Sequence, residues 1–149
     1  MPDHKFLILI CAAFSPDITL TYAEKFKMIQ GALTELLSQD EIGQIHLFQA
    51  TVQYFIKKQP SQKNHASEIC LAYYNESMIE DQFFINWHAK SKKGRTDKES
   101  DLYDRKAEKE MRTLLDEFVT WLQSDADYDE EAGKYTDARQ NWKNQRNFC

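Results

Sequence analysis

Residues 113–131 read TLLDEFVTWLQSDADYDEE, and they join the end of a predicted apolar helix to a strongly acidic segment. Phe118 and Trp121 lie in the helical part, whereas the whole stretch holds seven carboxylates and no lysine or arginine. Like charges at this spacing repel each other, so the segment costs stability unless a basic partner neutralises it. Two interpretations follow: a surface that binds Lys-rich peptides, or a solubilising segment after a terminal helix.

Upstream of this stretch, apolar residues recur at intervals of three and four and predict consecutive amphipathic helices. Glycine and proline are scarce, with four and three in 149 residues, so few positions break a helix. The expected helices cover residues 4–14, 17–38, 40–58, 63–74, 76–91 and 99–124. The sequence therefore predicts an all-α array of antiparallel helix pairs.

The pattern also predicts how the chain is divided and where its helices begin. One domain is expected over residues 1–131, followed by a tail over 132–149 that is disordered or loosely docked. Helix boundaries follow from capping residues. We expect the first, second, third and fifth helices to begin at Asp3, at Ser15 with Pro16, at Asp40 and at Asn75.

The apolar run FLILICAAF at residues 6–14 has two interpretations. It has the length of a signal-peptide core, but Asp3 stands where such a peptide is positively charged, so a buried helix is favoured. Cys11, Cys70 and Cys149 form no disulfide framework. The first two lie in apolar patterns and suit the core of a protein from a reducing compartment, so we expect a cytoplasmic location.

The sequence gives little support for catalysis or for a metal site. It lacks a Gly-rich phosphate loop, paired zinc-binding cysteines and a serine nucleophile elbow. His65 and Glu68 have the spacing of one helical face, but they stand alone and are interpreted as a surface contact. We expect a protein that is not an enzyme and needs no cofactor.

Two acidic stretches with aromatic residues flank a basic one. Residues 73–87, YYNESMIEDQFFINW, repeat the mixture of aromatic and acidic side chains seen at 116–131. Between them, residues 88–112 carry nine basic and six acidic side chains, which gives a net charge of +3. The loop 90–98 is the most one-sided part and suits an acidic protein or a phosphate backbone.

In their order, these features resemble the C-terminal domain of eukaryotic translation initiation factor 5, an atypical HEAT-like array also called the W-two domain. The resemblance covers residues 15–131 and is strongest over 73–131, where the loop SKKGRTDKE at 91–99 lies between the two boxes. It implies a scaffold that binds the Lys-rich tail of the factor 2 beta subunit, together with factor 3 subunit c and factor 1. Related domains occur in the factor 2 exchange factor and in factor 5-mimic proteins, and the Lys-rich loop favours factor 5.

The resemblance also implies which residues contact partners. The first box consists of Glu76, Glu80, Asp81 and Trp87. The second box consists of Glu117, Trp121, Asp125, Asp127, Asp129, Glu130 and Glu131. The basic loop contributes Lys92, Lys93 and Lys98.

This chain departs from the family pattern in three ways. The predicted helix before Trp121 is longer by about two turns. The tail 132–149 is basic rather than acidic, which suggests an intramolecular competitor for the acidic box. The family's GTPase-activating region, an N-terminal domain with a zinc ribbon, is not in this sequence, so we expect no such activity.

An RNA- or ribosome-binding module acting through loop 90–98 is the alternative function.

Overall fold

A computed structural model describes residues 2–123, 128–129 and 134–135. The α-helices are α1 (Pro2–Ala13), α2 (Tyr22–Ser38), α3 (Gly43–Val52), α4 (Ala66–Asn75), α5 (Asp81–His88), α6 (Arg105–Leu114) and α7 (Asp116–Leu122). A π-helix η1 (Gln53–Lys58) continues α3, and two 3-10 helices, η2 (Pro60–His65) and η3 (Lys92–Gly94), precede α4 and follow α5. The predicted all-α fold is confirmed for residues 2–123.

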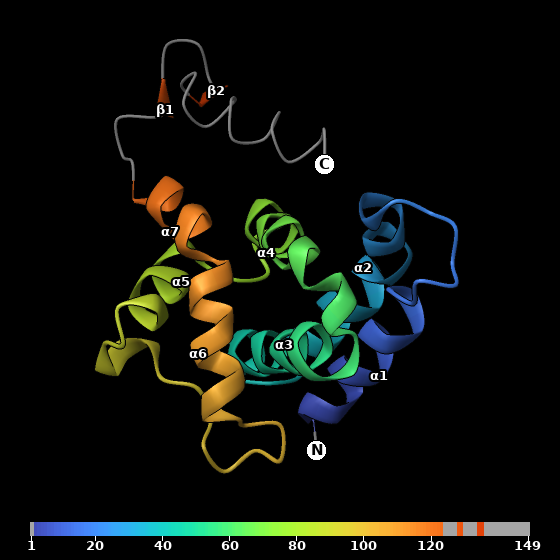
Figure 1. The fold of residues 1–149 in the computed structure, drawn as a ribbon, viewed down its shortest axis with the longest axis horizontal. Coiled ribbons are helices and arrows are strands. Elements are labelled where there is room, and N and C mark those ends of the chain that lie inside the picture. The colour runs from blue at the N-terminus through green and yellow to red at the C-terminus, as the bar shows by residue number, and fades with distance from the viewer. Residues whose placement is uncertain (1, 124–127, 130–133, 136–149) are drawn as a thin grey trace.

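The helices pack around one core of aromatic and aliphatic side chains. Helix α1 lies against α2 and α3, and α2 also contacts α4. At the opposite end of the molecule α5 packs on α7, while α6 runs beside η1 (Figure 1). Rings of Phe14, Phe48, Phe55, Phe84 and Phe118 are fully buried along this core. Burial of such large apolar groups is the main force that holds the array together.

Helix α1 contains the apolar run that had two interpretations. Phe6 and Ile10 are fully buried and Leu7 and Leu9 pack against the core in part, so the favoured helix is present, although Ile8 is 68% exposed and one side faces solvent. The α1 helix begins at Pro2, which places Asp3 inside the helix and not at its cap. Of the helices described in the structure, none is both long enough and apolar enough to cross a membrane.

The second helix begins later than predicted. Its N-cap is Thr21, whose hydroxyl accepts from the Glu24 N–H at 3.1 Å while the Glu24 carboxylate accepts from the Thr21 N–H at 3.3 Å. This reciprocal capping box satisfies two donors at once. The Ser15 hydroxyl accepts one bond, from the Asp17 N–H at 3.3 Å, and the Ser15 carbonyl accepts from the Ile18 N–H at 3.1 Å, which closes a turn. The predicted start at Ser15 and Pro16 is therefore wrong.

Two further predicted starts are displaced. Asp40 lies before α3, where its carboxylate accepts from the Ile42 N–H at 3.2 Å, and the helix itself starts at Gly43. Asn75 is the last residue of α4 and not the cap of α5. The chain turns at Ser77, which has a φ of 58°, before α5 begins at Asp81.

The long helix predicted over 99–124 is two helices. Turns occupy the residues before α6, and the Asp104 carboxylate caps α6 by accepting from the Ala107 N–H at 3.0 Å. Leu115, with φ −98° and ψ 5°, separates α6 from α7. The predicted helix looked longer than the family's because it counted residues 99–104, which are not helical, as part of the helix. The Asp104 cap fixes the actual start of α6.

A short strand pair follows the helices. Strand β1 (Tyr128–Asp129) pairs antiparallel with β2 (Lys134–Tyr135), with Asp129 opposite Lys134. No strand was expected after residue 15, so this pair was missed. It spans the predicted boundary between residues 131 and 132, and the rest of the predicted tail lies outside the described residues.

Candidate functional site

The two stretches interpreted as aromatic–acidic boxes meet in space. The Phe84 ring of α5 lies edge-on to Phe118 of α7, with centroids 5.0 Å apart. Tyr74, at the end of α4, lies edge-on to Trp121 of α7 at 6.0 Å. These pairs, 34 and 47 residues apart in sequence, join the two stretches through their aromatic side chains.

The acids of the first box surround the start of α5. Glu76 and Glu80 are exposed and Asp81 is half-buried. The Glu76 carboxylate accepts from Gln30 Nε2 at 2.8 Å, and that of Asp81 accepts from the Gln82 N–H at 2.8 Å. Both carboxylates keep solvent-facing lone pairs, so each can accept from a further donor.

Trp87 does not share that exposure. Its side chain is 1% exposed, its ring lies 4.6 Å from that of Phe48, and its indole N–H donates to Glu108 Oε1 at 3.0 Å. A ring buried to this degree has no surface for a partner. The expectation that Trp87 contacts a partner directly is wrong, because the ring fills the core beneath the basic loop.

Glu108 is the centre of a buried network that sequence reasoning did not find. Besides the Trp87 indole, its carboxylate accepts from Thr96 Oγ1 at 2.7 Å and lies 3.9 Å from the Arg112 guanidinium. Arg112 sits over the Trp87 ring at 4.8 Å and donates from Nε to the Trp87 carbonyl at 3.3 Å. The only signal in sequence was the i,i+4 pair Glu108–Arg112, which is common on exposed helices.

The basic loop is held by contacts with the core at its middle and near its C-terminal end. In the middle, Gly94 is packed so closely on α5 that a Cβ there would lie 2.2 Å from the Trp87 backbone nitrogen. Near the C-terminal end, the Asp97 N–H donates to Gln49 Oε1 at 3.2 Å and the Gln49 amide donates to the Asp97 carbonyl at 3.0 Å. Lys92, Lys93 and Lys98 project from this fixed loop and are exposed, as expected for contact residues.

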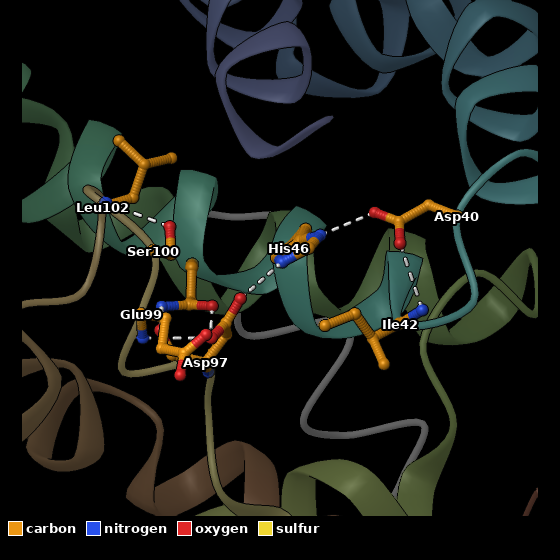
Figure 2. A network of polar contacts seen from close by, with 8 residues as sticks. Asp40, Ile42, His46, Asp97, Glu99, Ser100 and Leu102 are labelled. Atoms are coloured by element: carbon orange, nitrogen blue, oxygen red, sulfur yellow. Dashed lines mark hydrogen bonds and ion pairs between the residues drawn. The ribbon is translucent and has the colours of Figure 1, made fainter. Parts of the chain in front are cut away.

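His46 links the end of the basic loop to the start of α3. Figure 2 shows its ring between two carboxylates, with Nδ1 2.6 Å from Asp40 and Nε2 3.0 Å from Asp97. The ring is mostly buried, so both bonds form away from water. The hydrogen bond with His46 is the main cause that holds the pKa of Asp97 below its usual range.

The second box is described only in part. Glu117 is exposed on α7, whereas Trp121 is 5% exposed and stacks on Phe118 at 5.9 Å. Trp121 therefore packs within the core, in contrast to the contact role that the resemblance implies for it. The side chains of Asp125, Asp127, Asp129, Glu130 and Glu131 lie outside the described residues.

A groove lies between the basic loop and α6. Its cavity volume is about 970 Å³, and we call it the basic groove. Trp87, Glu108 and the half-buried Tyr103 are among the residues of its walls. Its basic lining residues are Lys90, Arg95, Lys98, Arg105, Lys106, Lys109 and Arg112. The sequence indicated the loop side of this groove but not the contribution of α6.

The described residues offer no arrangement suited to a metal. His65 Nδ1 and Glu68 Oε1 are 3.5 Å apart on a half-exposed surface, so the expected surface contact is confirmed. Across residues 4–123 no group of three or more His, Cys, Asp or Glu side chains is placed to hold an ion.

Comparison with known proteins adds the family. A family model described as W2, eIF4-gamma/eIF5/eIF2-epsilon, matches residues 43–132, which is more than half of the chain. The chain belongs to the W2 family. W2 domains are HEAT-like helical modules of translation initiation that bind other initiation factors. The W2 domain is the domain detected in the chain, and no catalytic domain is detected. No curated protein and no solved structure matches the chain.

The W2 match covers the helices that build both boxes and the basic groove. It begins at the first residue of α3 and ends at residue 132, just after the second acidic stretch. The helices α1 and α2 precede it and pack against α3, so they extend the W2 core at its N-terminal side.

Proposed function

We propose that this W2 domain is of the factor 5 type and acts as an adaptor in translation initiation, over a folded unit of residues 1–131. Its two acidic boxes bind Lys-rich segments of the factor 2 beta subunit. Factor 3 subunit c and factor 1 are the further partners that the resemblance to factor 5 suggests. The exposed lysines of the SKK loop, at Lys92 and Lys93, support the factor 5 type over its W2 relatives.

The observation that carries this proposal is the convergence of the two boxes. Tyr74 of the first stretch packs on Trp121 of α7, and the exposed Glu76 follows Tyr74 by two residues. This ring contact supports the inference that the first acidic stretch lies close to α7, the helix that leads into the second one. A Lys-rich segment with several charged blocks can then contact both boxes at once.

The burial of the aromatic rings and the exposure of the carboxylates support different roles for these two kinds of side chain. The rings of Trp87, Phe118 and Trp121 are buried, so they hold the helices together. We infer that exposed carboxylates, such as those of Glu76 and Glu80, contact the partner. Exposed ion pairs contribute little singly, about 0.2–1 kcal/mol each, so several must act together to give a specific complex. Binding should then be strongly weakened by salt.

Charge reversal tests the second box. Changing Asp127, Asp129, Glu130 and Glu131 to lysine should reduce the affinity for a Lys-rich peptide by about tenfold or more, since four favourable contacts become repulsive. A control variant carries the same change in net charge at four exposed acids outside the boxes, Asp17, Glu99, Asp101 and Glu110. Binding is measured by fluorescence anisotropy, and thermal unfolding checks that both variants fold.

The two variants separate a local effect from a general one. The proposal predicts a large loss for the box variant and a small one for the control. Unchanged affinity after the box reversal would show that these acids do not contact the peptide. An equal loss in both variants would show that only net charge matters.

A further inference from the structure

We propose that an apolar groove between α1 and α2 is the surface through which two copies of this chain associate. The groove has a cavity volume of about 400 Å³, and we call it the N-terminal groove. Figure 1 shows α1 and α2 at the end of the array opposite α5 and α7. Both helices precede the W2 match, so this proposal does not rest on the function proposed above.

The lining of the N-terminal groove is mainly apolar and open to solvent. Ile8 and Leu9 come from α1, and Ala32 and Leu36 come from α2. Ile8 is 68% exposed, and Met28, about one turn before Ala32 on α2, is 60% exposed. Large apolar side chains that gather on one surface mark an interaction site, whereas single scattered ones do not.

The place of this groove in the array indicates that a second helix pair covers it. In a stack of helix pairs each pair buries an apolar face against its neighbour, and an outermost pair needs a polar outer face to stay soluble. The α1–α2 pair has an apolar outer face instead. Because Ile8 and Met28 stay exposed, no element in the described part of the chain covers that face.

Two charged residues identify this second pair as that of another copy. Lys5 lies on the α1 wall and Glu35 on the α2 wall, and both are exposed. Among the described residues neither takes part in an ion pair. A two-fold axis along the groove places α1 of each copy over α2 of the other, so Lys5 meets Glu35 twice. The surface is therefore complementary to itself in charge as well as apolar.

The size of this face sets the strength of the association. Helices of 12 and 17 residues are about 18 and 25 Å long, and two packed helices present a face about 20 Å wide. Two such faces bury roughly 800 Å² in total, below the 1,200–2,000 Å² or so of a stable complex. Gly31 leaves room for close approach, since a Cβ there would meet nothing within 4 Å. We therefore expect a weak, reversible dimer that forms at high micromolar concentration.

Sedimentation velocity of the whole chain from about 5 μM to about 500 μM tests the proposal, and the average mass should rise from monomer toward dimer. Lys5→Glu and Glu35→Lys should each weaken association about tenfold or more, because both reciprocal pairs become repulsive. The controls Lys58→Glu and Glu99→Lys make the same charge changes at exposed positions outside the groove, so they should change it by less than about threefold.

Mixing the variants tests the two-fold geometry. An equimolar mixture of Lys5→Glu with Glu35→Lys should associate again, because every contact between unlike copies then joins opposite charges. The double variant that carries both changes in one chain should associate as the unchanged protein does, for the same reason. A mixture of the two control variants has the same net charges and should show no such gain.

A change of the apolar surface gives an independent measurement. Ile8→Asp should weaken association about tenfold or more, because its side chain leaves water in the dimer. Leu20→Asp, at a residue that is 40% exposed and lies outside the groove, is the matched control and should have little effect. Thermal unfolding checks that both variants fold. Should Ile8→Asp lower the melting temperature, the charge variants at exposed positions decide.

Four results would overturn the proposal. A chain that stays monomeric up to the highest concentration would leave the groove to a helix of another protein. An equal loss in the groove and control variants would show that net charge alone governs association. Failure of the mixed single variants to associate would exclude the two-fold arrangement. Growth beyond the dimer would show a head-to-tail contact, which does not close on itself.

Discussion

Replacing Glu108 with alanine tests whether one buried carboxylate joins the basic loop to α5 and α6. The side chain is 5% exposed and accepts from the Trp87 indole and the Thr96 hydroxyl, with the Arg112 cation 3.9 Å away. Alanine leaves these groups without their acceptor. A buried donor without a partner costs about 1–3 kcal/mol, and breaking a buried ion pair about 3–5 kcal/mol. Because Arg112 keeps some access to water, we expect a total loss of about 3–5 kcal/mol.

Urea unfolding followed by tryptophan fluorescence measures this loss. Glu108→Gln keeps an oxygen acceptor and the side-chain volume, so it should cost about 1–2 kcal/mol. Glu110→Ala, two residues further along α6 and exposed, is the matched control and should change stability by less than about 0.5 kcal/mol. An alanine effect below about 1 kcal/mol, or one equal to that of glutamine, would refute the role assigned to the carboxylate.

The remaining predictions concern one position each. Gly94→Ala should destabilise the protein by about 1–3 kcal/mol, because the new Cβ would meet the Trp87 backbone. Its control, Gly31→Ala, has nothing within 4 Å of the new Cβ and should stabilise α2 by about 0.5–1 kcal/mol. Thermal melts that rank the two variants in the opposite order would contradict the packing described for the loop. The Asp97 carboxylate has a lowered pKa in the folded state, so its contribution is present above the unfolded value of 3.8 and lost as pH falls below it. Asp97→Asn should accordingly flatten the acid limb of the stability–pH curve, and an unchanged limb would count against the bond. Trp121→Ala should cost about 3–5 kcal/mol in urea, and a cost under about 1 kcal/mol with lost peptide binding would make it a contact residue.

Apolar spacing was enough to predict the helical fold. Tyr22, Phe26, Ile29 and Leu33 recur at intervals of three and four and form the buried face of α2, because a helix that must cover a core repeats its apolar side chains at this spacing. Ala66, Ile69 and Tyr73 follow the same spacing and are buried on α4. These predictions use only local geometry, so they do not require knowledge of the neighbours.

Helix ends were predicted poorly because capping groups compete. Ser15 with Pro16 and Thr21 with Glu24 are both acceptable starts in sequence. The helix starts at Thr21 because its capping box satisfies two backbone donors, whereas the Ser15 hydroxyl satisfies one. Asp40 shows the other cause of error, since its carboxylate is also held by His46, a contact that exists only in the folded chain.

The exposure of the predicted lysines is confirmed, whereas the burial of the predicted tryptophans was not foreseen. The exposed Lys92, Lys93 and Lys98 of the loop lie where the resemblance placed them. Trp87 was misassigned because aromatic residues serve both cores and interfaces, and composition does not distinguish the two. The basic groove was missed for a related reason: the balance of charge along residues 88–112 hides the fact that Asp104 and its neighbours are engaged on other elements.

The most direct test of the central claim is a calorimetric titration of the whole chain with a Lys-rich peptide at low and at physiological ionic strength. An adaptor with two converging acidic boxes should bind the peptide saturably, with one site per chain and an affinity that falls steeply as salt is added. Loss of that binding on reversal of Glu76 and Glu80 would tie it to the first box. No saturable binding at low ionic strength, or an affinity that salt leaves unchanged, would contradict the account.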